Sequence, residues 1–189
     1  LRPGLTLIFR KSTYEIMNRK TFLKTSVALA GAASYPDVLA YAPRDSSIRV
    51  GVIGVHGMGW SNVIAMLKDR RVRLAAICDI DDTVIERRKS ELQKDGLTIQ
   101  TYHDYKDLLQ DNEVDAVIIA TPDHWHCLQL INAVHAGKHV YVEKPIGNSV
   151  RECEAMVAAV KKYDAIVQVG QWQRSQQHFQ DAVNFVHSG

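Results

Sequence analysis

A glycine-rich stretch early in the chain has the spacing of a loop whose backbone binds phosphate. It follows an apolar run and reads Gly54-Val55-His56-Gly57-Met58-Gly59, which matches the G-x-G-x-x-G pattern except that His56 stands at the second glycine position. Histidine is enriched at positive φ among the non-glycine residues, so we predict that His56 has positive φ and that the backbone path is kept. By itself, the loop is equally consistent with an ordinary turn from strand to helix.

An acidic residue at the end of the next apolar run favours the phosphate-binding interpretation. Asp79 comes about 20 residues after Gly59, where an acid accepts hydrogen bonds from the ribose hydroxyls of a dinucleotide. Asp81 and Asp82 crowd the same place, and no arginine stands there to receive a 2′-phosphate. We therefore predict that NAD is bound in preference to NADP. The alternative is that Asp79 only begins a turn.

Two further motifs lie farther along the chain. One is Ala-Thr-Pro-Asp-His-Trp-His, from Ala120 to His126, and the other is Val-Tyr-Val-Glu-Lys-Pro, from Val140 to Pro145. His124 and His126 are two residues apart and so lie on different faces of a helix, which argues against a metal-chelating pair. Trp125 is equally consistent with a core anchor and with a ligand contact.

These motifs can act together only if the fold brings them to one edge. From Ile48 onward, short β-rich runs alternate with helical stretches, which is the pattern of βαβ units. Capping spacings at Thr83 with Glu86 and at Ser149 with Glu152, together with Pro122 and Gly137, mark helix ends. The predicted strands are 48–55, 73–78, 98–102, 115–120, 139–143 and 166–169. The predicted fold class is α/β, a doubly wound parallel sheet of the Rossmann type, which binds ligands just beyond its strand ends.

Composition excludes several other classes of protein. The 189 residues carry a net charge of +2, and residues 1–47 contain 7 Lys/Arg against 3 Asp/Glu. Residues 48–189 are therefore close to neutral, and we predict no nucleic-acid surface on them. Cys78, Cys127 and Cys153 are too widely spaced for a disulfide framework or a zinc knuckle, and we expect buried free thiols. No apolar run is long enough to predict a membrane span.

The segment that begins at Met17 has the layout of an export signal. It is basic at Arg19-Lys20, and a short apolar stretch with small residues follows. Arg19-Lys20 resembles a twin-arginine signal in which the second arginine is lysine. We therefore assign residues 1–47 to a leader and predict an exported, periplasmic protein. An uncleaved amphipathic leader and a cytoplasmic location are the alternative.

Taken together, the motifs resemble the glucose-fructose oxidoreductase, inositol 2-dehydrogenase and MocA family (Gfo/Idh/MocA). The matching residues have that family's order and spacing, and they are the glycine loop, Asp79, Thr121-Pro122 with His126, Glu143-Lys144-Pro145, and Val169-Gly170 with Arg174. The resemblance implies an NAD-dependent oxidoreductase acting on a sugar, cyclitol or related polyol. It implies a cofactor domain at 48–170 and the opening of a second α/β domain at 171–189. For the full-length parent we also expect a homo-oligomer.

The resemblance also assigns roles to single residues. The nicotinamide end of the cofactor is expected to contact Thr121, Pro122, His126 and Glu143. Lys144 would reach both the cofactor and a substrate hydroxyl, because a lysine ammonium can hydrogen-bond the oxygen whose carbon gives up a hydride. The alternative for Lys144 is a surface lysine bridging to Glu143. Trp172 and Arg174 are candidate substrate contacts.

Two departures from the family pattern limit what the resemblance implies. His56 replaces the second glycine, which puts the tightness of pyrophosphate binding in question. The second departure concerns the family's second domain, which supplies an aspartate-histidine pair and of which we expect only the opening segment in residues 171–189. We therefore expect residues 1–189 alone to bind NAD without turnover. Three functions stay open: a polyol dehydrogenase, a glycoside-cleaving relative that uses NAD to oxidise a sugar transiently, and a non-catalytic nucleotide-binding module.

Overall fold

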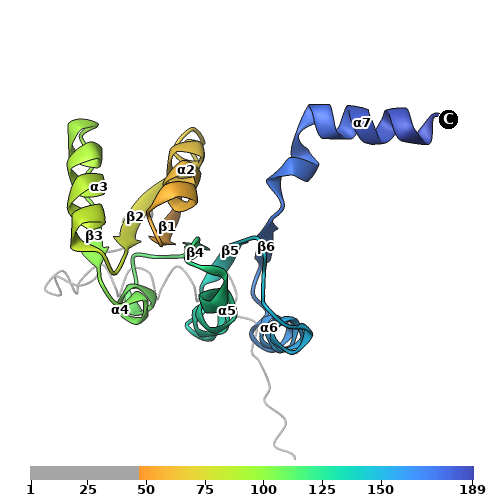
Figure 1. Ribbon diagram of the computed structural model, residues 1–189. Helices are drawn as coiled ribbons and strands as arrows, with labels where there is room; N and C mark the ends of the chain where they lie inside the picture. Colours follow the sequence, from red (N-terminus) through yellow and green to blue (C-terminus); the bar gives the residue numbers. More distant parts are fainter. Residues whose placement is uncertain (1–46) are drawn as a thin grey trace, which may run out of the picture. The chain divides into compact units, whose positions relative to one another are not determined.

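The sheet has the strand order of a doubly wound nucleotide-binding fold. The computed structural model describes residues 47–189, and the predicted export-like segment, with all of the predicted leader except Ser47, lies outside them. Six parallel strands are ordered β3-β2-β1-β4-β5-β6 (Figure 1). They are β1 (Ile48–Ile53), β2 (Val72–Cys78), β3 (Gln100–Tyr102), β4 (Ala116–Ile119), β5 (His139–Glu143) and β6 (Val167–Gly170). The predicted fold class is confirmed, and the order reverses between β1 and β4, where such folds bind ligands.

Helices cover both faces of this sheet. The helices of the described residues are α2 (Gly57–Met66), α3 (Asp82–Lys94), α4 (Tyr105–Gln110), α5 (His126–His135), α6 (Val150–Tyr163) and α7 (Gln177–His187), with 3-10 helices η2 (Asp123–Trp125) and η3 (Trp172–Ser175). In Figure 1, α2 and α3 lie on one face and α4, α5 and α6 on the other. The side chains of β1 alternate between two apolar cores, with Val52 in the core of α2 and α3 and Ile53 in the other.

Some of the helix ends are capped by the residues that the sequence predicted. Ser149 caps α6 as predicted, since its Oγ accepts the Glu152 N–H at 3.2 Å. The predicted cap of α3 is wrong, because Asp81 caps it and Oδ1 of Asp81 accepts the Thr83 N–H at 2.8 Å. A carboxylate satisfies these free amides and also interacts favourably with the positive end of the helix dipole. Gly137 has φ 75° just after α5, as its predicted role at a helix end requires.

The three cysteines are free thiols, of which only Cys78 is fully buried. Burial raises the pKa of Cys78 to about 12. The pKa of the half-buried Cys127 is also raised, mainly by burial. The prediction of buried thiols therefore holds for Cys78 and only partly for Cys127 and Cys153.

The last helix lies apart from the sheet. In Figure 1, α7 extends beyond β6, and none of its residues is buried. Phe185 and Val186 are 80% and 73% exposed. The assignment of residues 171–189 to a second domain stays a prediction. Among residues 47–189, no helix combines the length and apolar character that crossing a membrane requires.

Candidate functional site

The first and third glycines of the loop after β1 have no room for a side chain. Gly54 has φ +84°, and a Cβ there would lie 2.9 Å from the backbone of Ala120 and Thr121. A Cβ on Gly59 would overlap the carbonyl oxygen of Gly54. Glycine at these positions therefore allows the tight turn and lets α2 pack closely on β1, as a dinucleotide loop requires.

His56 does not have the predicted conformation. Its φ is −76° and its ψ is −165°, so the prediction of positive φ is wrong. His56 is the N-cap of α2, a position where an extended backbone is normal, and its side chain makes no capping hydrogen bond. A Cβ on the next residue, Gly57, would meet no atom within 4 Å. The backbone surface that a ligand could approach closely is therefore at Gly57.

The start of α2 provides the binding groups for an anion. Gly57, Met58 and Gly59 form its first turn, where amide N–H groups have no partner within the helix. Gly57 and Met58 are both exposed. The positive end of the helix dipole adds to the attraction. This arrangement suits the pyrophosphate of a dinucleotide.

Asp79 at the end of β2 is joined directly to the glycine loop. Its Oδ2 accepts the Val55 N–H at 2.9 Å, and its Oδ1 accepts the Asp81 N–H at 3.2 Å. On the other side of the same residue, Arg88 Nε donates to the Val55 carbonyl at 3.1 Å. The Arg88 guanidinium also lies 4.4 Å from the centre of the Trp60 ring. Asp79 therefore positions the loop and still has oxygen lone pairs for a ribose hydroxyl.

Glu143 at the end of β5 is the centre of a buried polar cluster. It is 4% exposed, and its Oε1 accepts from Asn62 Nδ2 at 2.9 Å while its Oε2 accepts the Lys144 N–H at 3.2 Å. Burial, followed by the Glu143 charge and hydrogen bonding to that carboxylate, raises the pKa of Tyr141. A Cβ on Gly170 would lie 2.9 Å from the Tyr141 hydroxyl, so that glycine makes room for the cluster.

Sequence reasoning missed Asn62, Tyr141 and Arg88. Tyr141 and Glu143 are two residues apart on one strand and so face the same side, a signal that was present in the sequence. Asn62 and Arg88 gave no such signal, because their contacts depend on how α2 and α3 pack against other elements.

The Lys144 side chain is accessible. Lys144 is exposed, and within residues 47–189 its ammonium forms no hydrogen bond or ion pair. It contacts the Glu143 carboxylate through its backbone N–H, so the alternative of a surface lysine bridging to Glu143 by its side chain is not observed in this part of the chain. The ammonium is therefore available to an external oxygen.

His126 is enclosed by the chain that leads out of β4 and β5. The residue is 1% exposed, with Nδ1 2.7 Å from the Pro145 carbonyl oxygen and Nε2 2.8 Å from that of Thr121. Gln129, one turn farther along α5, accepts from Thr121 Oγ1 at 2.6 Å. Thr121 is thus held through both its main chain and its side chain, whereas Pro122 is exposed.

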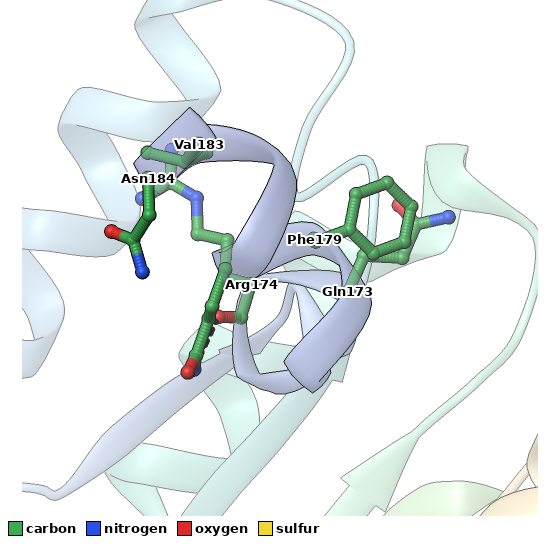
Figure 2. Close-up of a pocket in the computed structure, with 6 residues that line it drawn as sticks. Gln173, Arg174, Phe179, Val183 and Asn184 are labelled. Atoms are coloured by element: carbon green, nitrogen blue, oxygen red, sulfur yellow. Dashed lines mark hydrogen bonds between the residues drawn. The ribbon is translucent and has the colours of Figure 1, made fainter. Parts of the chain in front are cut away.

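The two candidate substrate residues line different hollows. Trp172 lines a groove of about 740 Å³ together with Met58, Asn62 and Tyr141. Arg174 lines a hollow of about 580 Å³ between η3 and α7, where Figure 2 shows it on the same side of the helix as Asn184. Their substrate roles stay predictions. No cluster of three or more His, Cys, Asp or Glu side chains suited to a metal ion occurs in residues 47–189.

The sequence is similar to those of known proteins. The oxidoreductase family with an NAD-binding Rossmann fold matches residues 48–171. A glycosyl hydrolase family 109 protein of Shewanella putrefaciens is 38% identical over 126 residues, covering 64% of this chain and 28% of that protein. A protein of the same name from Shewanella pealeana is 32% identical over 170 residues, covering 77% of this chain and 37% of the relative. The chain thus spans about a third of the length of these relatives.

Solved structures of inositol dehydrogenases have the same fold. Myo-inositol 2-dehydrogenase of Lactobacillus plantarum matches with a TM-score of 0.69 and 30% identity, over 76% of this chain and 42% of that one. Scyllo-inositol dehydrogenase of Lactobacillus casei, solved with bound NAD(H) and scyllo-inositol, matches with a TM-score of 0.68 and 26% identity, over 76% of this chain and 42% of that one. The glycine loop with Asp79 and the match over residues 48–171 lead to one conclusion: the chain belongs to the Gfo/Idh/MocA oxidoreductase family, and this part of it is an NAD-binding Rossmann domain.

Proposed function

We propose that the chain is the cofactor-binding part of an enzyme that moves a hydride to or from a hydroxyl-bearing carbon of a sugar, cyclitol or related polyol. The observation that carries this proposal is the accessible ammonium of Lys144, held next to the buried Glu143 cluster at the end of β5. The glycine loop lies at the same edge, because parallel strands present their carboxyl ends together. The inositol substrates named for the structural relatives support a polyol.

The residues of this chain would orient the substrate and stabilise charge. When bound, NAD would supply the acceptor for a hydride from the substrate carbon, and its reduced form the donor. As the carbon loses its hydride, its hydroxyl oxygen also loses a proton, so the substrate gives up two electrons in all and becomes a ketone. A hydrogen bond from Lys144 to that oxygen stabilises the developing negative charge. The base that accepts the proton is expected outside residues 47–189, from the aspartate-histidine pair of the family's second domain.

A second candidate function is NAD-assisted cleavage of a glycoside. The names of the Shewanella relatives favour it, because they are called glycosyl hydrolase family 109 proteins. In this reaction the hydride is removed, the glycosidic bond is broken by elimination, and the hydride is returned after water adds. NAD is therefore unchanged at the end of each cycle, and the same Lys144 would serve the oxidation step.

One set of assays separates these functions. The 189-residue chain should bind NAD and produce no NADH with any polyol, and steady NADH formation would contradict this. In the whole protein, a dehydrogenase accumulates NADH with a free polyol, whereas the glycoside-cleaving enzyme releases a sugar without net NADH. Lys144→Met should abolish either activity while NAD binding persists, and Lys161→Met, at an exposed position on α6, is the matched control. Full activity of the Lys144→Met variant would overturn the proposal.

A further inference from the structure

His126 connects two loops that carry the candidate cofactor and substrate contacts. Its buried ring lies between the carbonyl oxygens of Thr121 and Pro145, at 2.8 Å from Nε2 and 2.7 Å from Nδ1. A carbonyl oxygen only accepts hydrogen bonds, so the ring must be the donor in each bond that forms, and a neutral imidazole, with its single N–H, donates to one of the two oxygens at a time. Thr121 follows β4 and Pro145 follows β5, and these two strands are neighbours in the sheet. One side chain therefore bridges two strand ends.

The bridge fixes residues that are themselves accessible. Pro145 is preceded by Lys144, whose ammonium is free, and Thr121 is half-buried. Gln129 lies three residues after His126 on the same helix and holds the Thr121 hydroxyl at 2.6 Å. Thr121 is therefore held by two side chains of α5, and the Lys144-Pro145 segment by one of them.

We propose that His126 is a positioning residue for the nicotinamide half of the bound cofactor. It acts by holding the carbonyl groups of Thr121 and Pro145, and thereby the spacing between Thr121 and Lys144, without contacting the cofactor. The adenosine half depends on other groups. Val55, in the glycine loop, donates its N–H to Asp79 and accepts a hydrogen bond from Arg88 through its carbonyl oxygen. A change at His126 should therefore weaken binding of one half of the cofactor only.

Three substitutions separate the two contacts of the His126 ring. The amide nitrogen of Asn stands one bond from Cγ, as Nδ1 does, so His126→Asn keeps a donor toward Pro145. The amide nitrogen of Gln stands two bonds from Cγ, as Nε2 does, so His126→Gln keeps a donor toward Thr121. His126→Leu replaces the ring by an apolar side chain and removes both ring nitrogens. His124→Leu is the matched control, because His124 is exposed and two residues away.

The test compares NAD with ADP-ribose, which lacks the nicotinamide ring, by calorimetric titration of the 189-residue chain. Thermal unfolding of each variant is measured in parallel. We expect His126→Leu to raise the Kd for NAD about tenfold, equivalent to about 1.4 kcal/mol, with the Kd for ADP-ribose unchanged. The Asn and Gln variants should fall between it and the wild type, and they decide the outcome if the Leu variant does not fold.

Equal losses for NAD and ADP-ribose would overturn the proposal, because they would show a general effect on stability. Unchanged NAD binding in all three variants would do so as well. A wild-type chain that binds ADP-ribose as tightly as NAD would also overturn it, since there would be no nicotinamide contact to position. No substrate is used, so failure here is distinct from failure of the proposed hydride transfer.

Discussion

The two halves of the candidate site are built in different ways. The half proposed to hold the adenosine, at the ends of β1 and β2, consists mostly of backbone, and a side chain would not fit at Gly54 or Gly59. The half proposed to hold the nicotinamide, at the ends of β4 and β5, consists of buried polar side chains from separate elements, with Glu143 hydrogen-bonded to Asn62 and His126 between Thr121 and Pro145. Substitutions that add atoms should therefore destabilise the first half, and substitutions that remove hydrogen-bond donors should destabilise the second.

The largest expected effect comes from adding a methyl group to the loop. Gly59→Ala would place a Cβ against the Gly54 carbonyl oxygen, and we expect it to lower the free energy of unfolding by about 3 kcal/mol. Gly57→Ala is the control, because its Cβ meets nothing within 4 Å and should change that free energy by less than about 1 kcal/mol. Urea unfolding measures both, and equal stability of the two variants would contradict the packing described for Gly59.

Removing the carboxylate at the end of β2 should weaken the adenosine half. Asp79→Ala loses the bond to the Val55 N–H and the acceptor for a ribose hydroxyl, so we expect a loss of about 2 kcal/mol in NAD binding, or about thirtyfold in Kd. Preference for NAD over NADP should fall at the same time. Asp82→Ala, in the same acidic stretch but exposed, should leave the NAD affinity nearly unchanged when titrated alongside.

Removing a donor should destabilise the nicotinamide half. Asn62→Ala leaves Oε1 of the buried Glu143 without its side-chain donor, and we expect the free energy of unfolding to fall by about 1.5 kcal/mol. Ser61→Ala, at the preceding and exposed position of α2, should have little effect in the same denaturation experiment. If both variants were as stable as the wild type, the Glu143 cluster would not contribute to stability as described.

The smallest effect is expected at His56. Because its side chain makes no capping hydrogen bond, His56→Ser should stabilise α2, raising the free energy of unfolding by about 1 kcal/mol. His56→Gly should leave the Kd for NAD within about tenfold of the wild type. Complete loss of NAD binding in the Gly variant would show that the imidazole itself is a ligand.

The same contrast explains how much the sequence could predict. Gly54, Gly59 and the β-rich runs are local patterns, and from them the fold class was predicted correctly. The conformation of His56 was not, because it depends on where α2 begins. Asn62 and Arg88 act across the fold, on Glu143 and Val55, and only the packing of α2 and α3 brings them there.

The most direct test of the account is calorimetric titration of the 189-residue chain with NAD and with NADP. The account predicts saturable binding of NAD to a single site on each chain, because the first turn of α2 receives the pyrophosphate and Asp79 receives the ribose. It also predicts weaker binding of NADP, since the Asp79 carboxylate repels a 2′-phosphate. The absence of saturable binding at millimolar NAD, or tighter binding of NADP, would contradict it.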